Sequence, residues 1–178
     1  MLRHVALLRG INVGTAKRIA MADLRAVFET LGYAAVRTHL QSGNVVFDAQ
    51  NPLDAAATTD LEQAIADATA VHSRVLVIPA DRFLAIVEAN PFADAEDPSR
   101  MLVSFVDAMP DGALIIRPSD DELAPERVVF GSDAIYQWIP GGILSSRVNL
   151  GKAPQPATII TSRNLRTVRK IVDLISSP

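Results

Sequence analysis

Apolar residues in the first 79 positions alternate between the spacing of strands and that of helices. Residues 4–9 are typical of a strand, with apolar side chains at residues 5–8. Residues 36–40 and 45–47 alternate like paired strands around the turn residues Ser42, Gly43 and Asn44. Between them, apolar side chains recur at helical spacing before Gly32, which suits the end of a helix. These positions are Met21, Leu24, Val27, Phe28 and Leu31. The pattern predicts a strand, a helix and a hairpin.

A second helix and a fourth strand complete this segment. Asn51 and Pro52 predict an N-cap and a first-turn proline for an alanine-rich helix, which carries Leu61 and Ile65 on one face. Residues 75–78 form an apolar strand that ends at Pro79. The resulting order, βαββαβ, is that of the split βαβ or ferredoxin-like fold.

Residues 80–178 predict a second, degenerate half of the same α+β class. The predicted elements are, in order, a connecting helix ending near residue 90, a strand over 101–106, a short helix over 113–116 and a hairpin of strands over 128–130 and 135–139. An amphipathic helix closes the chain after a cap at Thr161 or Ser162. We therefore expect two domains, residues 1–79 and 80–178. Because no flexible linker separates them, we expect the halves to pack tightly.

Composition narrows the class of protein. The chain has 178 residues, of which 49% are hydrophobic, so it can bury a core. It contains no cysteine, which excludes disulfides and thiolate chemistry, and its three scattered histidines favour no metal site. No apolar run reaches the roughly 18 residues that a bilayer span needs, and the first residues lack a signal-peptide pattern. We expect a cytoplasmic protein without a membrane segment or cofactor.

The charge is distributed unevenly. Residues 1–47 carry a net charge of +4, residues 48–144 of −12, and residues 145–178 of +5. The charges of the two halves could simply attract one another, with the rest solvated. Alternatively, the basic ends converge on one face and attract an anion.

Residues 9–14 interrupt the pattern with two glycines around Asn12. Gly10 and Gly14 permit close approach of the backbone to a ligand, and Arg9 and Asn12 supply donors beside main-chain N–H groups. This predicts an anion cradle, with positive charge added by Lys17 and Arg18. The alternative is a tight strand-to-helix connection that Asn12 closes. Neither dinucleotide-binding nor P-loop spacing is present.

The hairpin turn offers further polar groups. Gln41, Ser42 and Asn44 are either turn residues or ligand donors, and Arg37 and His39 share a strand face with Gln41. Ser42 lacks the G-x-S-x-G setting of a hydrolase nucleophile.

The C-terminal region supplies the remaining candidates. Asn164 precedes the last helix, whose free N–H groups favour an anion, and Arg163 could complete the site that begins at Arg9. Arg147 ends the loop over residues 141–147, which could close over that site. A solvated helix face and a plain connection are the alternatives. The predicted ligand-binding set is Arg9, Gly10, Asn12, Gly14, Lys17, Gln41, Ser42, Asn44, Arg147, Arg163 and Asn164.

Three motifs carry a resemblance to a known family. Residues 5–14 (VALLRGINVG), residues 41–47 (QSGNVVF) and the tail residues 161–164 with 167–168 are together similar to the domain-of-unknown-function family 1697. Asn90-Pro91-Phe92 and Ser146-Arg147 fit its middle and late segments. The resemblance implies two ferredoxin-like halves and no assigned reaction. The chain departs from the family pattern at Thr15, Arg147 and Leu165-Arg166.

We therefore expect binding of a small anionic ligand, such as a phosphorylated metabolite or nucleotide. One alternative is a nucleic-acid-binding module, which the 5% aromatic content and the net charge of −3 weaken. Others are a metal-independent enzyme for a phosphate or carboxylate substrate, with His39 or a carboxylate moving the proton, and a module that docks an acidic partner. The oligomeric state stays open.

Overall fold

A computed structural model of the chain describes residues 1–12, 18–110, 117–148, 150 and 158–177. The chain divides into two compact units. The first unit contains Met1–Leu84 and Lys170–Pro178, and the second contains Ala85–Arg169. The domain boundary that the sequence predicts between residues 79 and 80, and the tight packing of the halves, stay predictions.

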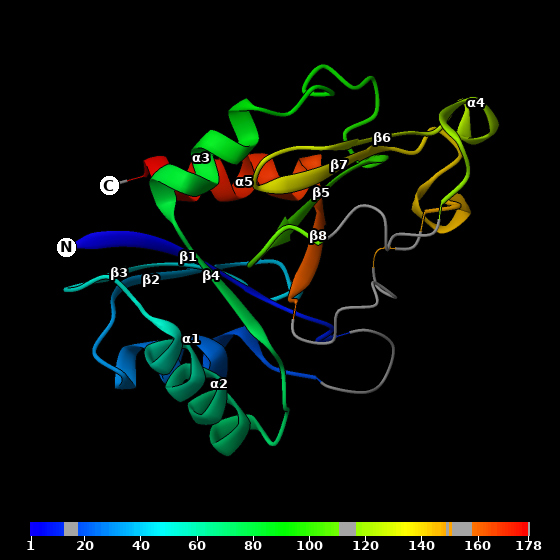
Figure 1. Cartoon of the computed structure of the whole chain (residues 1–178). Coiled ribbons are helices and arrows are strands. Elements are labelled where there is room, and N and C mark those ends of the chain that lie inside the picture. Colours follow the sequence, from blue (N-terminus) through cyan, green and yellow to red (C-terminus); the bar gives the residue numbers. More distant parts are fainter. Residues whose placement is uncertain (13–17, 111–116, 149, 151–157, 178) are drawn as a thin grey trace. The chain divides into compact units, whose positions relative to one another are not determined.

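The first unit is built on a four-stranded antiparallel sheet. Its elements are β1 (Leu2–Leu8), α1 (Met21–Thr30), β2 (Ala34–His39), β3 (Asn44–Ala49), α2 (Ala55–Thr69) and β4 (Val75–Pro79). The strand order is β2-β3-β1-β4, in which β1 is antiparallel to both neighbours. Two split βαβ units are thus interleaved, with α1 and α2 side by side on one face of the sheet (Figure 1). The predicted ferredoxin-like order is confirmed.

The core of this unit lies between the sheet and its two helices. Phe28, Tyr33 and Phe47 form an aromatic cluster with ring centroids 4.8–5.9 Å apart. Leu24 and Phe28 of the helical pattern and Val45 and Phe47 of the strand pattern are all fully buried. Gly32 follows α1 with a φ of +83°, as a glycine after a helix commonly does.

The start of α2 differs from the prediction. The helix begins at Ala55, and its N-cap is Asp54, whose Oδ1 accepts a hydrogen bond from Ala57 N at 2.8 Å. The predicted cap at Asn51 was wrong because a carboxylate closer to the alanine-rich run satisfies the first-turn N–H groups.

The second unit is built on another four-stranded sheet. It contains β5 (Met101–Val106), α4 (Asp120–Leu123), β6 (Arg127–Phe130), β7 (Ala134–Trp138), the 3₁₀ turn η2 (Ile143–Ser145) and β8 (Ile160–Asn164). The strand order is β6-β7-β5-β8, which matches that of the first sheet. The α+β class with two ferredoxin-like sheets is therefore confirmed. The helix predicted over residues 113–116 lies outside the described residues.

Two helices have residues in both units. They are α3 (Ala80–Glu88) and α5 (Leu165–Ser176). In the second unit, the buried Tyr136 hydroxyl donates to Ile86 O at 2.7 Å, which fixes the end of α3 to β7. The predicted cap of α5 was wrong: Thr161 and Ser162 belong to β8, and Asn164 Oδ1 accepts from Thr167 N at 2.9 Å.

Candidate functional site

The predicted glycine loop lies where three segments of the first unit meet. Leu8 N donates to Gly43 O at 2.9 Å, so the end of β1 is bonded to the hairpin turn. On its other side, Arg9 N donates to Arg74 O at 2.9 Å, and Ser73 Oγ donates to Arg9 O at 3.0 Å. The backbone of Arg9 is thereby fixed on both sides.

Gly43 is the point of closest approach in this junction. Its φ is +71°, and a Cβ there would lie 2.7 Å from Leu8 Cβ and 2.8 Å from Ile11 Cδ1. Gly10 also has a positive φ, of +65°, but a Cβ there would meet nothing within 4 Å. Glycine is thus required at position 43 for packing and at position 10 for backbone conformation alone.

Asn12 closes the loop from within. It has a φ of +53°, and its side chain bonds both backbone groups of Ile19: Oδ1 accepts from Ile19 N at 2.9 Å and Nδ2 donates to Ile19 O at 3.1 Å. Nδ2 also donates to Gln41 O. The Asn12 amide therefore holds the loop and the hairpin together, as the alternative of a tight connection closed by Asn12 predicts.

Asn44 holds the hairpin turn through its side-chain amide in a similar way. Asn44 is fully buried, and its Nδ2 donates to His39 O at 2.8 Å and to Ser42 Oγ at 2.9 Å. Gln41 is exposed and Ser42 half-buried. Asn44 thus stabilises the turn from inside.

Three arginines lie on the segments that meet at this junction. All three side chains, of Arg9, Arg18 and Arg74, are exposed. Arg18 directly precedes Ile19, which Asn12 binds, and the backbone of Arg74 accepts a hydrogen bond from Arg9 N. The Arg9 and Arg18 guanidinium groups make no hydrogen bond or ion pair with the residues that the structure describes. Gly14 and Lys17, also predicted here, lie outside those residues.

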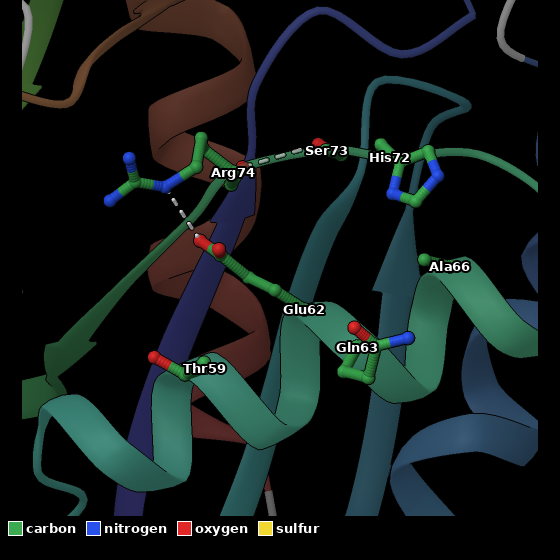
Figure 2. Close-up of a pocket in the computed structure, with 7 residues that line it drawn as sticks. All are labelled: Thr59, Glu62, Gln63, Ala66, His72, Ser73 and Arg74. Atoms are coloured by element: carbon green, nitrogen blue, oxygen red, sulfur yellow. Dashed lines mark hydrogen bonds and ion pairs between the residues drawn. The ribbon is translucent and has the colours of Figure 1, made fainter.

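A shallow pocket of about 280 Å³ adjoins Arg74. It is lined by residues of α2 and of the segment before β4, and Figure 2 shows the Arg74 guanidinium and the His72 ring on opposite sides of Ser73. Glu62 Oε1 accepts from Arg74 Nε at 3.1 Å and from Val75 N at 2.7 Å. The Glu62 carboxylate is therefore paired with the Nε side of the Arg74 guanidinium. The exposed His72 imidazole lies at the other side of the pocket.

Sequence reasoning missed Arg74 as a neighbour of Arg9. A signal existed: in the ferredoxin-like strand order, β4 is antiparallel to β1, so the residue before β4 lies beside the residue after β1. The observed register pairs Leu8 with Val75, which brings Arg9 opposite Arg74.

The polar strand face predicted as a ligand face is occupied at one end. Arg37 Nη1 donates to Leu174 O at 3.3 Å and to Ser177 O at 3.1 Å, in the C-terminal residues of the same unit. Val5, Leu7 and Val46 on this side of the sheet are also buried. Nucleic-acid binding at this face stays an alternative.

The remaining predicted residues belong to the second unit. Arg163 is 8% exposed, and its Nη1 donates to Thr161 Oγ1 at 2.8 Å and to Ser162 O at 2.9 Å; burial lowers the pKa of this guanidinium to about 10. Arg147 donates to Glu122 O, and Asn164 caps α5. A shared site for Arg9 and Arg163, which belong to different units, stays a prediction.

Among the described residues, no three His, Cys, Asp or Glu side chains gather in a way that could hold a metal ion. None of the helices in those residues is long and apolar enough to cross a membrane.

Comparisons with known proteins place the chain in a family. A family model described as "Protein of unknown function (DUF1697)" matches residues 1–136, and no curated protein matches. Among solved structures, the conserved bacterial protein SP0830 from Streptococcus pneumoniae is similar, with a TM-score of 0.69 and 23% identity over 98% of this chain and 99% of that one. This likeness supports the fold alone. Because the family model spans most of its length, the chain belongs to the DUF1697 family of proteins of unknown function.

Proposed function

We propose that the first unit binds a small anionic ligand, such as a phosphorylated metabolite or nucleotide, at the end of β1. The observation that carries this proposal is the state of Arg9. Its backbone is bonded on both sides, to Arg74 and Ser73, whereas its exposed guanidinium makes no bond with the described residues. Arg9 is thus a charged donor on a rigid support, which lowers the ordering cost of binding.

The local balance of charge supports an anion rather than a cation. Arg18 and Arg74 lie on the segments bonded to the same loop, and the nearest carboxylate of the adjoining pocket, Glu62, is already paired with Arg74 Nε and Val75 N. The two amides at the junction, Asn12 and Asn44, are engaged in backbone bonds. We therefore assign the charge recognition to the arginines and the geometry of the loop to the asparagines.

The experiment is a thermal-unfolding screen against phosphate, sulfate, nucleotides, sugar phosphates and short oligonucleotides. A ligand that binds only the folded protein raises the melting temperature by mass action. We expect a selective rise with one class of small anion, reduced in Arg9→Ala and Arg74→Ala. Arg25→Ala is the matched control, because Arg25 is exposed on α1 without a bond to the described residues.

Two results would contradict the proposal. One is the absence of any shift with every small anion. The other is an equal loss of the shift in Arg25→Ala, which would indicate general attraction between charges. A shift only with oligonucleotides, steeply reduced by salt, would favour the nucleic-acid alternative.

A further inference from the structure

A pocket of about 380 Å³ in the second unit carries charges of both signs. It is lined by Pro91, Phe92, Asp94, Ala95, Glu96, Arg127 and Trp138. It is formed by the segment after α3 together with one strand end each of β6 and β7, where Arg127 and Trp138 are directly paired across the two strands. Its volume is within the range of small-ligand sites, about 300–1,000 Å³.

The segment that carries the two carboxylates is held in place. Asn90, which is buried, accepts a hydrogen bond at Oδ1 from Phe92 N at 2.9 Å. Arg169 Nη2 donates to Ala93 O at 2.8 Å. The Asn90-Pro91-Phe92 motif singled out in the sequence thus positions Phe92, which is 9% exposed, as a wall of the pocket.

Arg127 is oriented by that aromatic ring. Its Cζ lies 4.8 Å from the centroid of Phe92, a cation–π contact that leaves the N–H groups at the edge of the guanidinium available for hydrogen bonds. Arg127 is exposed and makes no ion pair with the residues that the structure describes.

The two carboxylates of the pocket are similarly available. Asp94 and Glu96 are exposed and accept no hydrogen bond from the described part of the chain, although Arg127 lines the same pocket. The neighbouring Asp97 behaves differently, because it pairs with Arg100 Nε at 3.1 Å and accepts from Ser99 N at 2.9 Å. Opposite charges therefore line one pocket without forming an ion pair with each other.

We propose that this pocket binds a small zwitterion of the amino acid class with an apolar side chain. Arg127 presents the planar donor pair that a carboxylate accepts, and Asp94 and Glu96 present acceptors for an ammonium group. Pro91, Ala95 and the ring of Trp138 supply the apolar surface for the side chain. A ligand with only one charge would leave the opposite charge of the pocket unpaired, so both charges of the ligand are needed for tight binding.

Tryptophan fluorescence is a direct probe of this pocket, since Trp138 is the single tryptophan of the chain. The experiment titrates the full chain with L-leucine and follows tryptophan emission. Two matched probes keep the side chain and remove one charge each: 3-methylbutylamine lacks the carboxylate and 4-methylpentanoate lacks the amine. We expect saturable binding of L-leucine and at least tenfold weaker binding of either probe.

Variants separate the two ends of the ligand. Arg127→Gln should weaken L-leucine binding at least tenfold without weakening binding of the amine, which no longer faces an unpaired cation. The double variant Asp94→Asn/Glu96→Gln should weaken L-leucine binding without weakening binding of 4-methylpentanoate, which no longer faces unpaired carboxylates. Asp121→Asn, an exposed carboxylate of the same unit, is the control, and the melting temperature of each variant checks its folding.

The proposal is overturned if L-leucine neither changes the emission in a saturable way nor raises the melting temperature. It is also overturned if the amine alone binds as tightly as L-leucine, or if folded Arg127→Gln binds L-leucine normally. None of these results bears on the anion site at β1, because the two sites share no residue.

Discussion

Arg3 and Asp48 form a side-on ion pair across β1 and β3. Arg3 Nε lies 2.9 Å from Asp48 Oδ1, and Nη2 lies 3.1 Å from Oδ2. The remaining nitrogen, Nη1, donates to Ile175 O at 2.7 Å and to Ser177 O at 2.9 Å. Asp48 thereby orients the arginine that holds the last turn of α5 within the first unit, where cations suit the free carbonyl groups of a helix end.

This pair predicts a loss of stability in acid. The hydrogen bonds from Arg3 hold the pKa of Asp48 below its ordinary value of 3.8. The unfolded chain therefore binds a proton at higher pH than the folded chain, and stability falls as the pH drops below about 5 toward the folded pKa. Urea unfolding of the native chain and of Asp48→Asn, between pH 7 and pH 3, measures this contribution.

Asp48→Asn should be less stable at pH 7 and should show a shallower decline in acid. Asp60→Asn is the control, since Asp60 is exposed on α2 and makes no hydrogen bond with the described residues. Parallel curves for the native chain and Asp48→Asn would contradict the assignment.

Gly43 and Gly10 form a matched pair for the junction at the end of β1. Both have a positive φ, so alanine costs about 1–2 kcal/mol at either position. Only at Gly43 does the added Cβ meet Leu8 and Ile11 at under 3.0 Å. We expect Gly43→Ala to lose a further 1–3 kcal/mol, roughly the cost of overpacking. Equal free energies of unfolding for the two variants would show that position 43 has room.

Asn12 should contribute through its hydrogen bonds rather than through its backbone conformation. Asn12→Ala leaves the buried Ile19 N–H without its acceptor and should cost about 1–3 kcal/mol. Asn12→Gly tests the same loss without the strain of a positive φ, so it should recover only a small part of the stability. Full recovery in Asn12→Gly, measured by urea unfolding, would mean that the bonds to Ile19 add nothing.

Asn164 should behave as a helix cap. Asn164→Ala removes the acceptor of Thr167 N and should cost about 1 kcal/mol, whereas Asn164→Asp and Asn164→Ser keep an acceptor and should retain most of the stability. Thermal unfolding of the three variants compares them. If all three lose the same amount, the role of Asn164 lies in β8 or in a bound ligand instead.

Much of the fold follows from local patterns. Leu24 and Phe28 are buried at helical spacing and Val45 and Phe47 at strand spacing, because periodicity specifies which face of an element is apolar. The order βαββαβ followed in turn, since short connections restrict how neighbouring strands pair. The N-cap residues of the helices were harder to predict. Asn51 and Asp54 are both residue types that suit a helix start, and only the hydrogen bond from Ala57 N to Asp54 distinguishes them.

The candidate site depended on tertiary structure. The sequence by itself determined the class of the fold, the faces of its elements and the glycine loop after β1, because these depend on spacing and on backbone conformation. It could not determine which polar groups remain available, since Asn12, Asn44 and Arg163 are committed to partners up to 29 residues away. Only the folded chain brings Arg74 beside Arg9 and sets Arg127 on the ring of Phe92. The physical reason is that hydrogen bonds and charge contacts depend on distance in space, which sheet register decides and sequence separation does not.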